Sequence, residues 1–265
     1  MRILQFGCGN MGGAMLAGWL AGGVPASDFT VVDPYLETAP EGVRLLRGAP
    51  SGEAAADVVL IGFKPQQFAE TIATVAPHVG PETLLLSILA GVDLETLRTA
   101  FPAAGAVVRV MPNLSVALGK SPIALFGDAA GEAKALTDRL MAPLGQGEWL
   151  ASEDQMDLVT ALAGSGPAFV YRFIDALAQG ATELGLPREQ ADRLALAMVE
   201  GAALLAAQLP HAPGELARRV ASPGGTTQKG IDVLDADARL VHLMTDTLRA
   251  ARDRSAEMTR EARRC

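Results

Sequence analysis

The chain has 265 residues, of which 49% are hydrophobic and 20% charged, with a formal net charge of −8. This composition excludes a disordered protein, and the length allows one or two domains with a large core. The acidic balance argues against a nucleic-acid partner.

The first strand and the turn after it carry the clearest motif. Residues 2–6 read as a short apolar strand, and a helical stripe begins at Met11. Strand, GxGxxG and helix in this order place a pyrophosphate on backbone amides and on the positive end of a helix dipole. We therefore predict a dinucleotide site on Gly7, Cys8, Gly9, Asn10, Met11 and Gly12.

Asp33 follows the second predicted strand, 29–32, and lies 21 positions after Gly12. An acid at this point accepts a hydrogen bond from the ribose 2′-hydroxyl and repels a 2′-phosphate, which favours NADH. Arg44 and Arg47 either soften that repulsion or stand as surface charges on the next helix. NAD(H) and NADP(H) therefore both remain candidate cofactors.

The rest of the first half alternates apolar strands with helical patterns. Strands are predicted at 58–63, 83–89, 107–111 and 123–126, and helices at 65–79, 94–100 and 132–141. Continuous apolar strands suit a parallel sheet that helices cover on both faces. We predict an α/β fold with a Rossmann-type doubly wound sheet over residues 1–152.

Residues 153–265 are predicted to form an all-α domain. Ser165 and Pro167 indicate the capped start of a helix that ends near Gly185, and later helices are predicted up to Leu209, over 215–220 and over 236–260. The predicted helix over 194–209 is apolar nearly all the way round, and a domain of a few helices cannot cover all of this apolar surface. We expect a second subunit to cover it, giving a homodimer.

Ser222 to Thr227 pack hydroxyls and glycines directly before a helical pattern that contains Ile231 and Leu234. Unpaired N–H groups and threonine hydroxyls at a helix N-terminus form a binding site for a small carboxylate. A plain capped helix start accounts for the same residues. The sequence thus leaves a binding site and a structural cap as alternatives.

Localisation follows from what the chain lacks. Two cysteines cannot make a disulfide framework and fit a reducing compartment. No signal-peptide pattern precedes the first strand, and the run 194–209 is interrupted by Glu200 and Gln208 and too short to cross a bilayer. We expect a cytoplasmic protein with no membrane partner, and we assign no metal site.

Over nearly its whole length the chain resembles the pyrroline-5-carboxylate reductase family. The resemblance rests on the glycine turn, Lys64-Pro65-Gln66, Arg109 to Asn113, Gly164 to Phe169 and, most specifically, Ser222 to Thr227. It implies a helical dimerisation domain, and relatives form larger rings of dimers. It places the nicotinamide near Phe63, Lys64, Pro65, Ala90, Gly91, Met111, Pro112 and Asn113.

Lys64 and Asn113 also fit ordinary structural roles. Lys64 suits a surface lysine at the start of a helix, and Asn113 suits a turn former. The next two residues, Leu114-Ser115, depart from the Thr-Pro that is usual in the family.

The reaction that the resemblance implies is hydride transfer from a reduced nicotinamide to the C=N carbon of 1-pyrroline-5-carboxylate, giving L-proline. Backbone amides of Gly224, Gly225, Thr226 and Thr227, with Ser222 beside them, would bind the carboxylate. The Thr227 hydroxyl would bond the ring nitrogen, so Thr227 is the catalytic candidate.

Other functions remain as alternatives. A reductase of another cyclic imine fits the same motifs. A β-hydroxyacid dehydrogenase would carry a lysine on the helix that opens the second domain, and residues 166–186 contain none. A non-catalytic nicotinamide sensor would have no need for the hydroxyls of 222–227.

Overall fold

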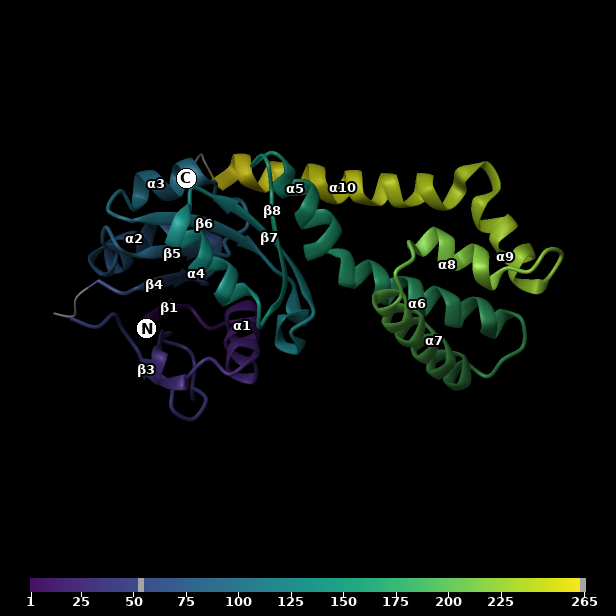
Figure 1. Cartoon of the computed structure of the whole chain (residues 1–265), viewed down its shortest axis with the longest axis horizontal. Coiled ribbons are helices and arrows are strands. Elements are labelled where there is room, and N and C mark those ends of the chain that lie inside the picture. The colour runs from purple at the N-terminus through teal and green to yellow at the C-terminus, as the bar shows by residue number, and fades with distance from the viewer. Residues whose placement is uncertain (52–54, 263–265) are drawn as a thin grey trace. The chain divides into compact units, whose positions relative to one another are not determined.

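One sheet, in the order β3-β2-β1-β4-β5-β6-β7-β8, forms the centre of the amino-terminal half (Figure 1). The computed structural model describes residues 1–51 and 55–262. The strands are β1 Ile3–Phe6, β2 Phe29–Val32, β3 Arg44–Leu46, β4 Val58–Ile61, β5 Leu84–Ser87, β6 Ala106–Met111, β7 Ser121–Gly127 and β8 Gly145–Trp149. Neighbours are parallel except β6 and β7. From β1 the chain runs outward to β3, then returns to β4 on the other side of β1.

Helices cover both faces of this sheet because its strands are apolar on both sides. On one face, α1 (Asn10–Ala21) and α4 (Gly131–Met141) pack against the sheet through residues such as Trp19 and Leu140. On the other face, α2 (Phe68–Val75) and α3 (Leu94–Ala100) contribute Val75 and Leu97. The predicted doubly wound α/β domain is confirmed.

Two strands and one loop differ from the sequence prediction. β3 and β8 were not predicted, because β3 is three residues long and β8 is mostly exposed. One of the two alternatives for Arg44 and Arg47 placed them on a helix, and that alternative is wrong. Arg44 begins β3, Arg47 follows it, and residues 34–43 cross from β2 to β3 without a helix.

The later part of the chain is helical. The helices are α5 Gln155–Val159, a short π-helix at Thr160–Gly164, α6 Gly166–Glu183, α7 Arg188–Gln208, α8 Pro213–Val220, α9 Thr226–Asp235 and α10 Arg239–Ala262. Ser165 was predicted as a helix cap, but its backbone is helical and its N–H donates to the Thr160 carbonyl at 2.9 Å. The continuous helical stretch that leads into α6 therefore starts at Gln155.

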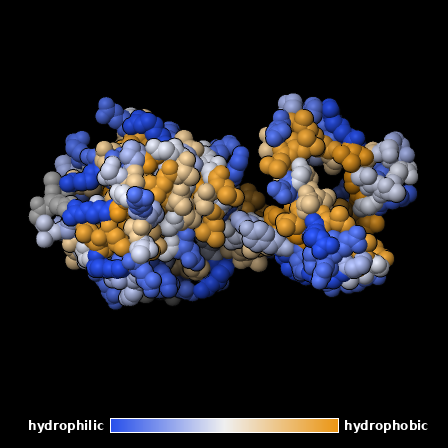
Figure 2. Space-filling model, turned by 90° about the horizontal axis from the view of Figure 1, so that it is seen from below, coloured by the Kyte–Doolittle hydropathy of each residue, from blue (hydrophilic) through white to orange (hydrophobic). Residues whose placement is uncertain are grey.

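Contacts divide the chain into two units, one formed by Met1–Ser165 with the segment from Ala250, the other by Gly166–Arg249. The second unit has a small core of its own, in which Ala178, Ala191 and Ala195 are the buried apolar residues. Large apolar side chains of α7, such as Leu194 and Leu205, are more than half exposed. Figure 2 shows orange side chains gathered around a hollow in this unit.

Membrane-spanning potential is confined to one bent pair of helices. Among the helices of the described residues, none is by itself long and apolar enough to cross a bilayer. The pair α7 and α8, bent by 118°, meets the length and composition criterion only when both are taken together.

We predict that the exposed apolar surface of the helical unit is buried in a homodimer, because patches of this kind on a monomer are otherwise rare. Light scattering at micromolar concentration should give an even multiple of the chain mass, twice that mass for a dimer. A well-folded monomer under these conditions would contradict the prediction.

Candidate active site

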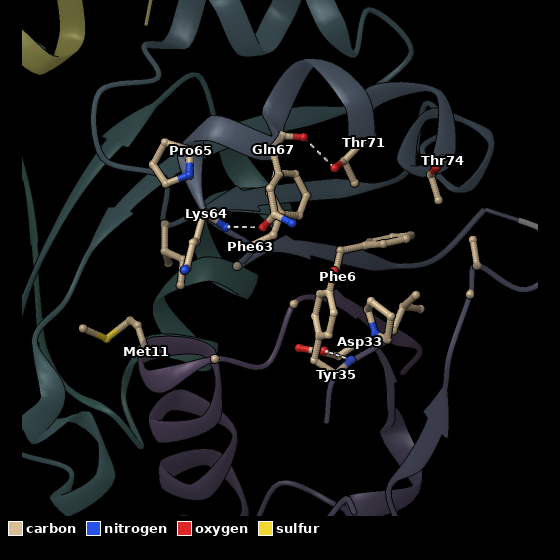
Figure 3. Close-up of a pocket in the computed structure, with 18 of the residues that line it drawn as sticks. Phe6, Met11, Asp33, Tyr35, Phe63, Lys64, Pro65, Gln67, Thr71 and Thr74 are labelled. Carbon is tan, nitrogen blue, oxygen red and sulfur yellow. Dashed lines mark hydrogen bonds between the residues drawn. The ribbon is translucent and has the colours of Figure 1, made fainter. Parts of the chain in front are cut away.

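A cavity of about 970 Å³ opens beyond the carboxyl ends of β1, β2 and β4 (Figure 3). This is the point at which the strand order reverses, where ligands bind in open α/β sheets. Predicted cofactor residues from three separate loops line it together: Gly7, Gly9, Asn10, Met11, Asp33, Phe63, Lys64 and Pro65. The volume lies at the upper end of the range for small-molecule and cofactor sites.

The glycine turn forms one wall because its backbone approaches β4 and α1 closely. Gly7 has φ +86°, and a Cβ there would lie 2.5 Å from the Phe63 nitrogen. A Cβ on Gly12 would lie 2.7 Å from the Gly7 carbonyl oxygen. Both positions therefore require glycine for the fold itself.

Gly9 differs from its neighbours in the turn. A Cβ on Gly9 would meet nothing within 4 Å, and its backbone is extended with φ −71°. Gly9 is the residue before α1, and within the described chain no side chain caps this helix. The first N–H groups of α1 are consequently available to an anion.

Asp33 connects the glycine turn to the β2–β3 loop. One carboxylate oxygen accepts a hydrogen bond from the Cys8 N–H at 2.7 Å, and the other accepts from the N–H groups of Tyr35 and Leu36 at 2.8 and 3.1 Å. Asp33 is nearly buried and lines the cavity. Its charge is held in place by backbone donors.

Cys8 is buried and is not among the residues that line the cavity. Burial first, and then the negative charge of Asp33, raise the pKa of its thiol, while the Gln5 amide lowers it in part. The thiol is therefore protonated at neutral pH, and Cys8 is no nucleophile.

Arg47 lies across the same loop. Its guanidinium donates to the carbonyl oxygen of Leu36 and, at 3.1 Å, to that of Glu37. Arg47 and Tyr35 both line the cavity next to Asp33. A cation is thus available on the Asp33 side, although it is engaged by main-chain carbonyls.

Phe63, Lys64 and Pro65 lie on the side of the cavity opposite Met11 and Asp33 in Figure 3. Pro65 opens a short 3-10 helix, Pro65–Gln67, ahead of α2. The Gln67 side chain accepts a hydrogen bond from the Lys64 N–H at 3.2 Å, which fixes the loop after β4. Gln67, Thr71 and Thr74 also line the cavity and were not predicted; they follow an apolar strand, which is the signal that could have found them.

Seven predicted cofactor residues do not line this cavity in the described chain: Cys8, Gly12, Ala90, Gly91, Met111, Pro112 and Asn113. Asn113 is buried and serves the fold. Its Oδ1 accepts from the Ser115 N–H at 2.9 Å, and its Nδ2 donates to the Ala163 carbonyl at 2.9 Å. The backbone at Gly91 packs against Met258 of α10. A cofactor role for these residues stays a prediction.

The predicted substrate segment, Ser222 to Thr227, belongs to the helical unit and runs from the loop after α8 into the first turn of α9. Ser222, Thr226 and Thr227 are exposed, and the Gly225 N–H donates to the Ser222 carbonyl at 2.9 Å. Gly224 has φ +72°, which a glycine adopts without strain. Thr226 and Thr227 are the first residues of α9, whose N-terminus no side chain caps within the described residues. Free N–H groups and two hydroxyls therefore meet at one helix end.

Known proteins match both parts of the chain. A family described as pyrroline-5-carboxylate reductase dimerisation matches residues 153–258, and one described as NADP oxidoreductase, coenzyme F420-dependent, matches residues 2–91. The pyrroline-5-carboxylate reductase of Pseudomonas aeruginosa is 35% identical, over 98% of this chain and 97% of that protein. Pyrroline-5-carboxylate reductase 2 of Bacillus subtilis is 33% identical, over 97% and 95%.

The same family appears among solved structures. A pyrroline-5-carboxylate reductase from Coxiella burnetii superposes with a TM-score of 0.89 at 30% identity, over 97% of this chain and 98% of that one. With matches along both halves and a cavity at the sheet's switch point, this chain belongs to the pyrroline-5-carboxylate reductase family.

Proposed function

We propose that this chain reduces 1-pyrroline-5-carboxylate to L-proline with a hydride from NADH or NADPH. The observation that carries the proposal is the cavity at the β1–β4 switch point, where an uncapped helix, a close-packed glycine turn and the loop after β4 meet. Similarity to reductases of this name along nearly the whole chain supports the choice of substrate. Residues 1–152 would bind the dinucleotide, and residues 153–265 would supply the substrate segment and a homodimer.

The cofactor, when bound, supplies the hydride, and the protein has to hold and orient it. The first N–H groups of α1, at Asn10 and Met11, would bind the pyrophosphate. Asp33, Tyr35 and Arg47 line the cavity where the adenosine ribose is expected. Phe63, Lys64 and Pro65 would lie on the nicotinamide side, with Ala90, Gly91, Met111, Pro112 and Asn113 as further candidates.

The substrate carboxylate would be held by the N-terminus of α9, through the amides of Gly224 to Thr227 with Ser222 beside them. A helix end that no side chain of the described residues caps offers both donors and a favourable dipole for one negative charge. The Thr227 hydroxyl would bond the ring nitrogen of the imine. An imine nitrogen that arrives protonated needs no strong general acid, so hydrogen bonding and orientation are enough.

Assembly and location complete the proposal. The sparse core and exposed apolar residues of the helical unit support a homodimer formed through that unit. We place the protein in the cytoplasm, with a small-molecule substrate and neither nucleic acid nor membrane as a partner. In this proposal the dimers assemble further into a ring.

The proposed reaction is tested by the loss of 340 nm absorbance when pyrroline-5-carboxylate is added to protein and reduced cofactor. We expect turnover, and we expect a higher kcat/KM with NADH if the Asp33 charge decides the choice. A higher value with NADPH would assign the 2′-phosphate to Arg47 instead. No turnover with either cofactor would contradict the proposed function.

Gly9→Ala tests whether the glycine turn binds the pyrophosphate, without disturbing the fold. The added methyl group meets no protein atom within 4 Å, so thermal stability should be unchanged. The methyl group would stand where the phosphates approach, and we expect the dissociation constant for reduced dinucleotide to rise about tenfold or more. Gly180→Ala, on an open face of α6, is the matched control. Unchanged affinity in Gly9→Ala would remove this turn from the site.

Thr227→Val should lower kcat/KM for the imine about tenfold, the scale of one lost hydrogen bond, while leaving dinucleotide binding unchanged. Thr245→Val is the control, since the Thr245 hydroxyl donates within its own helix to the Val241 carbonyl. Wild-type kinetics in Thr227→Val would show that this hydroxyl takes no part in the reaction.

A further inference from the structure

Gln5 is a fully buried amide in the middle of β1, a strand whose other residues are apolar. It shares the face of Ile3, which packs with Met15 and Trp19 of α1. A buried side-chain amide is costly unless its polar atoms find partners. Each polar atom of the Gln5 amide is therefore expected to have a hydrogen-bond partner.

The amide nitrogen donates to two carbonyl oxygens of the glycine turn, and the amide also faces the Cys8 thiol of that turn. Nε2 donates to the Gly7 carbonyl oxygen at 3.0 Å and to the Gly12 carbonyl oxygen at 3.1 Å. Within residues 1–51 and 55–262, Oε1 has no hydrogen-bond partner. The reversed amide would bring Oε1 against two carbonyl oxygens, so the nitrogen must face the turn.

Two side chains hold the peptide group between Gly7 and Cys8, and we call this pair of hydrogen bonds the clamp. The Gly7 carbonyl oxygen accepts from Gln5, and the Cys8 N–H donates to Asp33 at 2.7 Å. A peptide group is planar, so fixing its oxygen and its nitrogen fixes the direction in which the chain leaves towards Gly9. The Gly12 contact then ties the first turn of α1 to the same amide.

We propose that Gln5 is a positioning residue for the dinucleotide: it orients the Gly7–Cys8 peptide and the start of α1 so that the pyrophosphate meets preset N–H groups. Gln5 acts from beneath the turn and does not line the cavity. The inference rests on the proposed function only in naming a dinucleotide as the ligand. A preorganised site costs less ordering on binding, so losing the clamp should weaken affinity.

Gln5→Met separates positioning from a plain contribution to stability. Methionine has a similar length and removes the unpartnered Oε1, but it leaves the carbonyl oxygens of Gly7 and Gly12 without the Gln5 donor, so the melting temperature should fall by a few degrees while the protein stays folded. The dissociation constant for NADH and for NADPH, measured by fluorescence titration without substrate, should rise about fivefold to tenfold. The KM for the imine should stay unchanged.

Leu4→Met is the matched control, because Leu4 neighbours Gln5 on β1 but packs on the opposite face of the sheet. It should leave dinucleotide affinity at the wild-type value. Wild-type affinity in Gln5→Met, or equal losses of affinity in Gln5→Met and Leu4→Met, would overturn the proposal.

Gln5→Glu gives a second readout that does not depend on the methionine variant. When protonated, the acid can donate to one carbonyl oxygen; when ionised, it faces two carbonyl oxygens and repels both. The ratio of its dissociation constant to that of wild type should therefore rise between pH 6 and pH 8. A ratio near one at both values, or loss of the folded state in both variants, would overturn the proposal. Dinucleotide binding is measured without the imine, so the role of Gln5 can be tested even if the protein does not catalyse the proposed reaction.

Discussion

The candidate cofactor site depends on the close approach of three backbone segments at the switch point of the sheet. The Gly62 N–H after β4 donates to the Phe6 carbonyl at 2.7 Å, and the nitrogen of Phe63 lies only 2.5 Å from the place that a Cβ of Gly7 would take. Side chains at these places would push β1, α1 and β4 apart. Since none intervenes, the loops after β1, β2 and β4 border one cavity, and the helix dipole of α1 points towards it.

Polar contacts then set the orientation of these segments. Asp33 binds the N–H of Cys8 from one side, and Gln5 binds the carbonyls of Gly7 and Gly12 from beneath. Both side chains are largely buried, so water competes little for these hydrogen bonds. The same Asp33 carboxylate that is predicted to bear on cofactor choice also holds the glycine turn to the β2–β3 loop. Any substitution of Asp33 made to change cofactor preference will therefore also disturb the turn.

The sequence was enough to predict the sheet, the glycine turn and the helical second half, since continuous apolar strands and helical periodicity are local signals. It was not enough for β3 and β8, whose few residues gain strand structure from their neighbours in the sheet. It also missed Gln5, because an isolated polar residue in an apolar strand shows no partner until α1 folds back onto β1. Asn113 illustrates a different limit: its residue type suited both a turn and a cofactor contact, and the structure shows its amide bonded to Ser115 and Ala163.

The helical unit links assembly to folding. Its buried apolar residues are three alanines, whereas leucines and a methionine of α7 remain exposed in the single chain. So small a core cannot offset the conformational entropy lost on ordering several helices. We infer that the unit becomes stable when a second copy covers these side chains, so its folding and dimerisation form one equilibrium. Ser222 to Thr227 belong to this unit, so the proposed substrate segment is part of the unit that is proposed to dimerise, whereas the cavity of the first unit lies at the edge of a well-packed sheet.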